Sequence, residues 1–318
     1  MSEARLRIDQ AGPLTTIQDR GRFGYQRYGV TEGGPMDRAA YLIGQAVVGH
    51  NPEGAAIEVG LGGITLQCAA GTVAVAVTGG NFTITIDGKD RRGWLVTTLN
   101  TGSKLEITPG RWGSWCYIAF AGSIRSPVWL GSRSTHPALT FTGRPLIRGD
   151  EITIESVSEI AVVERELTIP VFCQPRSTIG LVVGPQERFF AEGALGELFS
   201  ASYFLSSSSD RMGVKLEGPK LQISASLDML SEGVLRGSVQ VAGGGSPVVL
   251  VADHQITGGY PKIATMISAD QDAFIQLRPH QTVRFREVSV EQAVSRARMR
   301  KRVLHAYISL LTGERSAR

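Results

Sequence analysis

The stretch that decides the fold class is TVAVAVTGGNFTITI, residues 72–86. Valines at 73, 75 and 77 alternate with small residues, and apolar residues alternate again from Phe82 to Ile86. A period of two is typical of a β-strand, and a glycine pair between two such runs is typical of a hairpin. The stretch therefore predicts two antiparallel strands joined at Gly79-Gly80.

Short runs of the same kind recur along the chain, and turn residues separate most of them. They lie at 105–107, 115–120, 152–154, 181–183, 248–251, 274–277 and 283–285. This spacing favours closed or nearly closed β-barrels over βαβ units. Glycine accounts for 38 of the 318 residues, which fits a fold with many tight turns.

Helix signals are few. Apolar periodicity predicts helices over 36–48 and 189–199. The third predicted helix is the tail, where Ser289-Val290-Glu291-Gln292 fits a capping box. Its apolar stripe consists of Val294, Ala297, Leu304, Ile308 and Leu311. We expect this helix to dock on its own domain or on a sister subunit, with a membrane-surface or partner-helix role as the alternative.

Charge is distributed unevenly. The chain carries +4 overall, but residues 291–318 hold seven Arg or Lys and two Glu. The tail therefore carries +5 and the rest of the chain −1. The basic balance belongs to a tail, which argues against a body that binds nucleic acid.

Targeting and redox signals point to the cytoplasm. No apolar run approaches the roughly 18 residues of a membrane helix, and the segment MSEARLRID is polar. The three cysteines, Cys68, Cys116 and Cys173, are far apart and form no CxxC pair. We therefore expect a cytoplasmic protein with no membrane partner, no disulfide framework and no zinc ribbon.

A weak internal repeat predicts the domain organisation. LIRGDEITI at 146–154 aligns with LRPHQTVRF at 277–285, and the QDRG of residues 18–21 resembles the DRMG of residues 210–213. We predict an N-terminal β-domain over 1–160, a related β-domain over 161–288 and a basic helical tail over 289–318.

The first of three polar, glycine-rich segments spans residues 12–37. Arg20 and Arg22 offer rigid guanidinium forks that match a carboxylate or a phosphate. Asp19 stands beside Arg20 and could hold that fork in place. The alternative is a structural Asp–Arg pair that closes a loop.

The second segment, residues 209–219, repeats this theme with Asp210 and Arg211. Met212 beside Gly213 adds an apolar surface with close backbone approach. The alternative is a buried ion pair that ties a loop to a barrel.

The third segment, residues 231–266, holds the best candidate, the stretch from Asp253 to Tyr260 after an apolar strand. Strand ends deliver polar side chains to a rigid rim, where sites are often built. Gly258-Gly259 permits close contact with a ligand. Tyr260 and Lys262 could orient or polarise a small amide or carboxylate. The alternative is a hairpin whose Asp and Thr side chains satisfy backbone groups.

Several other chemistries lack their signatures. The histidines at 50, 136, 254, 280 and 305 show no metal-ligand spacing, and His254 is not taken as a general base. The hydroxyls of GSRST, residues 131–135, are expected to bond their loop, because no nucleophile elbow surrounds them. The chain has no phosphate-binding Gly-x-x-x-x-Gly-Lys-Ser/Thr loop and no Met-Lys-Met for covalent biotin.

The three polar segments carry a family resemblance. TIQDRGR (16–22), GPMD (34–37), GSRST, SDRMG (209–213) and TGGYPKIAT (257–265) occur in this order. With them the chain resembles the allophanate-hydrolase-subunit-2 family over about residues 6–285. Members include the C subunit of bacterial 5-oxoprolinase, the KipA protein and half of the carboxyltransferase domain of urea carboxylase. The chain departs from the family's usual pattern at 242–246, 256 and 279–281.

The resemblance implies a mainly β fold of two tandem cyclophilin-like β-barrels, with few helices and a C-terminal helix. It implies an enzyme subunit that works together with a B-type (KipI-like) subunit and an A-type subunit. The assembled enzyme would use ATP to open 5-oxoproline to glutamate. We expect the isolated chain to be inactive. The alternatives are a KipA-like regulator that antagonises a kinase inhibitor, and a carboxyltransferase acting on urea or a related amide from carboxybiotin held elsewhere.

The residue types and the resemblance together define one predicted site for a small amide or lactam. The predicted catalytic residues are Arg20, Arg211, Asp253, Thr257, Tyr260 and Lys262. The predicted substrate-binding residues are Asp19, Arg22, Asp37, Asp210, Met212, Gln240, Gln255, Gly258 and Gly259. No metal ligand is predicted, and ATP is expected to bind with the partner subunits.

Overall fold

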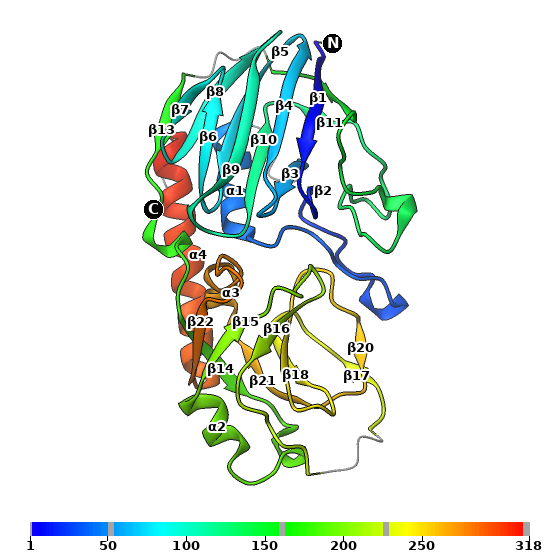
Figure 1. Ribbon diagram of the computed structural model, residues 1–318, viewed down its shortest axis with the longest axis vertical. Helices are drawn as coiled ribbons and strands as arrows, with labels where there is room; N and C mark the ends of the chain where they lie inside the picture. The colour runs from blue at the N-terminus through cyan, green and yellow to red at the C-terminus, as the bar shows by residue number, and fades with distance from the viewer. Residues whose placement is uncertain (1, 50–53, 159–162, 225–228, 314–318) are drawn as a thin grey trace. The chain divides into compact units, whose positions relative to one another are not determined.

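The computed structural model describes residues 2–49, 54–158, 163–224 and 229–313. The chain forms two compact units (Figure 1). The first contains Met1–Arg22, Gly33–Gln174 and Leu304–Arg318, and the second contains Phe23–Glu32 and Pro175–Val303. This division differs from the predicted ranges: residues 23–32 belong with the second unit, and the tail is divided between both. The predicted boundary at residue 160 and the tail charges of Glu314, Arg315 and Arg318 lie outside the described residues.

The first unit contains two β-sheets. The seven-stranded sheet has the order β11 (Ser123–Ile124), β12 (Glu151–Glu155), β1 (Ala4–Ala11), β4 (Ile64–Ala70), β9 (Lys104–Trp112), β6 (Asn81–Ile86) and β7 (Lys89–Arg91). The six-stranded sheet has the order β13 (Arg165–Leu167), β8 (Trp94–Asn100), β5 (Thr72–Thr78), β10 (Cys116–Phe120), β3 (Ala56–Val59) and β2 (Thr16–Gln18). Apolar side chains from both sheets pack into one core cluster.

Strand β5 is buried on both faces, and its sequence explains why. Val73, Val75 and Val77 join the core shared with the other sheet, while Ala74 and Ala76 pack in a second cluster with helix α1 (Arg38–Val47). Small alanines are needed there because the helix lies close. At Gly44 of α1, a Cβ atom would stand 2.8 Å from the Thr78 hydroxyl. The valine–alanine alternation thus positions α1.

The predicted hairpin across residues 72–86 is wrong in its pairing. β5 pairs with β8 and β10, whereas β6 pairs with β7 and β9 in the other sheet. Gly79 and Gly80 both have positive φ and lead the chain from one sheet to the other. β5 thus has a hydrogen-bonded partner at each edge, and both partners belong to its own sheet.

The second unit is a closed barrel of seven strands within the described residues. Their order is β14 (Thr178–Val183), β21 (Lys262–Met266), β18 (Ser238–Val241), β19 (Pro247–Leu250), β16 (Gly213–Glu217), β15 (Ser202–Leu205) and β22 (Thr282–Glu287). A parallel pairing of β22 with β14 completes the ring. Strands β17 (Glu232–Gly233) and β20 (Thr257–Gly258) form a separate two-stranded sheet. In the sequence, β17 comes just before the barrel strand β18, and β20 comes just before the barrel strand β21.

The helices of the structure confirm two predicted helices and show that one predicted strand is wrong. α1 falls within the predicted range 36–48, and α2 (Ala194–Ser200) overlaps the predicted 189–199. The predicted strand at 274–277 is wrong, because Ser268–Ile275 forms helix α3. Its apolar residues lie around the whole helix, so the sequence shows no helical stripe.

The two halves of the sequence repeat, 146–154 and 277–285, do not have the same strand pairing. β12 pairs antiparallel with β1 and β11, whereas β22 pairs with β14 in parallel and β15 antiparallel.

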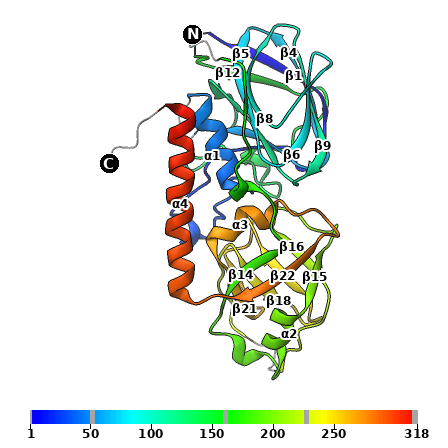
Figure 2. The same ribbon diagram turned by 90° about the vertical axis from the view of Figure 1, so that its left-hand side faces the viewer.

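The tail forms helix α4 (Val290–Thr312), the long red helix in Figure 2. The capping box is confirmed: Gln292 N donates to Ser289 Oγ and Ser289 N donates to Gln292 Oε1, both at 3.3 Å. In the first unit, Leu304, Ile308 and Leu311 pack beside the α1 cluster. Among the described residues, α4 included, no helix is both long and apolar enough to span a bilayer.

The prediction of a mainly β chain with few helices and a C-terminal helix is confirmed. The barrel closes in the second unit, while the first unit stacks two sheets on one core.

Candidate functional site

In the first unit, Asp19 holds the GSRST loop. Its Oδ1 accepts from Ser132 Oγ and Ser134 Oγ, both at 2.7 Å, and from Gly21 N at 2.9 Å. Its Oδ2 accepts from Arg133 N at 2.5 Å. The loop hydroxyls therefore bond the loop, as expected. Four donors from the protein satisfy this buried carboxylate, which supports the loop-closing alternative for Asp19.

Arg20 and Arg22 of the first segment differ in their surroundings. Arg20 is exposed, whereas Arg22 is 1% exposed. The Arg22 Nη2 donates to the Ser134 carbonyl, and the guanidinium lies 5.2 Å from the centre of the Trp129 ring. A guanidinium stacks well on an aromatic face. Arg22 thus fixes the same loop as Asp19, whereas the Arg20 side chain is exposed to solvent.

Asp37 caps helix α1 and belongs to a buried network. Its carboxylate accepts from Ala40 N at 2.9 Å, and its own N–H donates to the Tyr117 hydroxyl at 2.7 Å. The Tyr117 hydroxyl donates to Glu58 Oε2 at 2.8 Å, which also accepts from Met36 N at 2.8 Å. Burial first, and then the charges of Glu58 and Asp37, raise the pKa of Tyr117 well above its ordinary value.

Sequence analysis missed Glu58. The signal was a single glutamate in the buried strand Ala-Ile-Glu-Val, because a fully buried carboxylate needs bonding partners. Together, Glu58 and Asp37 fix the backbone of the GPMD segment. Gly34 in that segment has φ +83° and lies against the Arg20 carbonyl, only 2.7 Å from where a Cβ would stand. Arg20 is therefore packed on the segment that these carboxylates position.

In the second unit, Arg211 and Asp253 form a buried ion pair. Arg211 Nε lies 2.7 Å from Asp253 Oδ2, and Nη2 lies 2.9 Å from Oδ1. Both side chains are 1% exposed. The two backbones are also joined, because Asp253 N donates to Arg211 O at 2.7 Å. This geometry supports the alternative of an ion pair that ties a loop to the barrel.

Asp210 and Met212 are placed by a turn. Asp210 Oδ1 accepts from Met212 N at 2.7 Å and from Gly213 N at 3.1 Å. Asp19 makes the same local bond to Gly21 N. The similarity of the two motifs is therefore a shared Asp turn, but the buried arginine is Arg22 in one and Arg211 in the other. Met212 is 45% exposed.

Polar side chains gather on neighbouring strands β18 and β21. Gln240 is the register partner of Lys262, so both side chains stand on one face of the barrel sheet. Gln255 Nε2 donates to Gln240 Oε1 at 3.2 Å, and Gln240 Nε2 donates to Tyr260 O at 3.2 Å. A Cβ at Gly258 would stand 2.6 Å from Gln240 Nε2. Glycine at 258 therefore leaves room for this amide pair.

Two residues that sequence analysis missed complete this cluster. Gln186 Nε2 donates to Glu232 Oε2 at 2.6 Å, and Gln186 Oε1 accepts from Lys262 N at 2.8 Å. The Lys262 ammonium lies 3.5 Å from Glu232 Oε2. Neither residue stands in a motif, and no spacing in the sequence links them to Lys262.

The other predicted residues of the third segment are exposed or half-buried, and His254 is buried next to Asp253 in the sequence. Thr257 is exposed and Tyr260 is 48% exposed, and Gly259 is half-buried. His254 is 4% exposed, and its Nδ1 lies 2.5 Å from the Gln255 carbonyl. Burial lowers the pKa of His254, and this hydrogen bond opposes part of that effect.

The predicted residues are divided between the two units. The first unit contains Asp19, Arg20, Arg22 and Asp37. The second unit contains Asp210, Arg211, Met212, Gln240, Asp253, Gln255, Thr257, Gly258, Gly259, Tyr260 and Lys262. Within the second, the cluster of Gln186, Glu232, Gln240, Gln255 and Lys262 has the donors and acceptors to bind an amide or a carboxylate. We call it the β18–β21 cluster.

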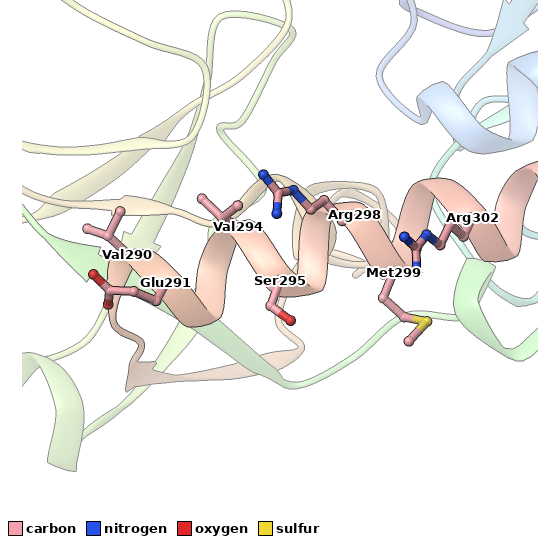
Figure 3. A pocket seen from close by; sticks show the side chains of 7 residues that line it. All are labelled: Val290, Glu291, Val294, Ser295, Arg298, Met299 and Arg302. Carbon is pink, nitrogen blue, oxygen red and sulfur yellow. The ribbon is translucent and has the colours of Figure 1, made fainter.

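Two surface grooves of the second unit are lined by other residues. A groove of about 550 Å³ lies along α4, lined by Val290, Glu291, Val294, Ser295, Arg298, Met299 and Arg302 (Figure 3). A second, of about 350 Å³, lies between Lys220–Ile223 and the glycines 243–245. Across the described ranges, no three His, Cys, Asp or Glu side chains gather as a metal site requires.

Comparison with known proteins defines the class. The family model described as "Carboxyltransferase domain, subdomain A and B" matches residues 28–287. The chain aligns with a Kluyveromyces lactis urea amidolyase structure at a TM-score of 0.84 and 25% identity, over 96% of this chain and 20% of that one. A K. lactis urea carboxylase structure gives 0.83 and 25%, over 96% and 29%. The chain therefore belongs to the carboxyltransferase-domain family, and it spans only a fraction of those two enzymes.

Two relatives match over nearly their whole length. The chain is 34% identical to the C subunit of 5-oxoprolinase from Haemophilus influenzae, over 87% of this chain and 89% of the relative. It is 31% identical to the C subunit of 5-oxoprolinase from Escherichia coli, over 91% and 93%. Urea amidolyase of Saccharomyces cerevisiae is also 31% identical, but the match covers 17% of that protein.

Proposed function

We propose that the chain is the C subunit of a 5-oxoprolinase and that the assembled enzyme opens 5-oxoproline to glutamate. The observation that carries this proposal is the near full-length match to relatives with that name, 34% identical over 89% of the Haemophilus protein. The matches to urea amidolyases cover a small part of those proteins, so they support the domain class more than the activity.

The reaction class fits the polar groups of the second unit. Ring opening adds water across an amide bond, so the site has to orient an amide and a carboxylate. The amides of Gln240 and Gln255 and the ammonium of Lys262 supply such donors and acceptors. We propose that Tyr260 and Thr257, which are exposed beside them, contact the substrate from the solvent side.

The buried ion pair has a positioning role in this proposal. Arg211 and Asp253 bond each other through two contacts and are shielded from water. Such a pair fixes the backbone from which Gln255 and Thr257 extend. Arg20, which is exposed in the first unit, is the arginine proposed to steady an anionic group.

Partners and ATP are part of the proposal. Hydrolysis of an unstrained lactam needs an energy source, and ATP hydrolysis to ADP and phosphate would supply it. The chain has no phosphate-binding loop of the Gly-Lys-Ser/Thr kind, so we propose that ATP binds with an A-type and a B-type partner subunit. The isolated chain is then inactive.

A second candidate is carboxyl transfer to an amide. The family description and the structural match to urea carboxylase favour it. In that case the chain receives a carboxyl group from biotin on another protein, because it has no Met-Lys-Met site. The β18–β21 cluster serves both reactions.

Co-expression with neighbouring A-type and B-type subunits tests the proposal. We expect glutamate release from 5-oxoproline only when all three proteins and ATP are present. Turnover of 5-oxoproline by the purified chain alone contradicts the proposal that the partner subunits are required for activity. A stable complex that leaves 5-oxoproline intact, but carboxylates urea when a carboxybiotin-bearing protein is added as the donor, supports the second candidate.

A further inference from the structure

The ammonium of Lys262 is a shielded charged donor of the β18–β21 cluster that forms no hydrogen bond within the described residues. The side chain is 14% exposed and the Nζ atom itself is shielded from solvent. Among the described residues, no acceptor forms a hydrogen bond with Nζ. An ammonium has three donors, and buried donors are nearly always bonded. A buried donor that lacks an acceptor calls for an explanation, and a bound anion is one of the explanations that its charge fits.

The carboxylate that pairs with the Lys262 ammonium belongs to an exposed residue, Glu232. Glu232 Oε2 lies 3.5 Å from Nζ, and the Glu232 side chain is 57% exposed. The same oxygen accepts from Gln186 Nε2 at 2.6 Å. Glu232 therefore presents one carboxylate oxygen to an amide donor and an ammonium, but its distance from the ammonium is long for a charged hydrogen bond.

The donors themselves are held by the barrel. Gln186 Oε1 accepts from the Lys262 backbone N–H at 2.8 Å, which orients the amide donor toward the same side as the lysine. Lys262 stands on β21, a barrel strand, in register with Gln240 on β18. Glu232 instead stands on the two-residue strand β17, which pairs only with β20 among the described strands. The anion is thus attached to the less extensively bonded segment.

We propose that Lys262 and Gln186 form the binding site for the substrate carboxylate, and that Glu232 occupies this site until the substrate displaces it. The proposal deepens the function proposed above and rests on it for the identity of the substrate. 5-Oxoproline carries one carboxylate and one lactam amide. The register pairing places the Gln240–Gln255 amides beside Lys262, where they meet the lactam while the ammonium meets the carboxylate.

The first experiment measures KM for 5-oxoproline in the assembled complex with ATP. For Lys262→Met we expect KM to rise at least tenfold, because the charged donor is lost. For Glu232→Gln we expect KM to fall threefold or more, because the competing anion is gone. Glu192→Gln, an exposed glutamate of the same unit, is the matched control and leaves KM unchanged.

An unchanged KM in Lys262→Met overturns the site, and an unchanged or raised KM in Glu232→Gln overturns the displacement. If Lys262→Met does not fold, inhibition by 2-pyrrolidinone decides. That lactam lacks the carboxylate, so Glu232→Gln should not change its inhibition constant. A parallel fall for both compounds contradicts carboxylate recognition.

A second experiment separates this inference from the proposed function. Acetic anhydride labelling of Lys262, followed by mass spectrometry, is measured on the full chain. We expect 5-oxoproline to slow labelling at least fivefold and 2-pyrrolidinone to have no effect, and Glu232→Gln to label faster without ligand. Protection in a chain whose complex shows no turnover supports the site while rejecting the activity. Equal labelling with and without 5-oxoproline, in a complex that does turn over, rejects the site and keeps the activity.

Discussion

Removing the Arg211 charge is the clearest test of how the second unit is held together. Arg211 and Asp253 are each 1% exposed and bond through two contacts of 2.7 and 2.9 Å. Arg211→Met keeps most of the aliphatic volume but leaves the Asp253 carboxylate buried without its cation. We therefore expect the variant to lose stability rather than to lose only activity.

The magnitude follows from the burial. Breaking one partner of a buried ion pair costs about 3–5 kcal/mol. For a unit of this size, each kcal/mol lowers the melting temperature by about 2–4 °C. We expect the unfolding transition of the second unit to fall by roughly 6–20 °C, measured by differential scanning calorimetry and by urea unfolding.

Two further variants make the test decisive. Arg284→Met removes an exposed arginine of the same barrel that donates to Ser202 at 2.8 Å, and its effect should stay within about 1 kcal/mol. Arg211→Met with Asp253→Leu removes both charges and should recover most of the lost stability. A melting temperature for Arg211→Met within about 2 °C of the wild type, below the smallest shift expected for a broken buried pair, refutes the structural role. Loss of turnover at that stability makes Arg211 a substrate contact.

Three further predictions concern buried groups. Asp19→Ala removes three hydrogen bonds to the GSRST loop and one to Gly21, and should speed hydrogen exchange at the Arg133 amide by a factor of ten or more; unchanged exchange contradicts its loop-holding role. Because the folded pKa of Tyr117 is raised, the free energy of unfolding should decline as pH rises above about 10, and urea unfolding of Tyr117→Phe should lack this decline. Because the folded pKa of His254 is lowered, stability should decline as pH falls below about 6.5; an NMR titration that gives His254 a pKa above that value contradicts the assignment.

The sequence predicted the fold class because apolar periodicity and turns are local. The apolar periodicity of α1 and the capping box of α4 could be predicted for the same reason. Strand pairing was not readable. The run from Thr72 to Ile86 looks like a hairpin, but the partners of β5 are β8 and β10, which come later in the chain. Helix α3 was missed because its apolar residues follow no stripe.

The candidate site was predicted where motifs carry it. Asp253, Gln255 and Lys262 stand in one contiguous segment, so their joint presence in the second unit follows from their spacing. Gln186 lies outside the three polar segments, and Glu232 lies 30 residues before Lys262 in the third. Their contacts with Lys262 and with each other form only in the folded chain. Glu58 was detectable in principle, as the lone acid in a buried strand, because burial of a carboxylate demands partners.

The partners of each buried charge separate structural groups from candidate binding groups. Asp19 has four protein donors, and Asp253 has a two-contact arginine. Since the fold satisfies these charges, no ligand is needed to explain them, and their loss should appear first as lost stability. The Lys262 ammonium is shielded yet bonded to no acceptor among the described residues. An anion that binds closer to the ammonium than Glu232 does would therefore lower the free energy of the site. This lowering contributes to the free energy of binding. By this argument the site is centred on Lys262 rather than on the more conspicuous Asp–Arg motifs.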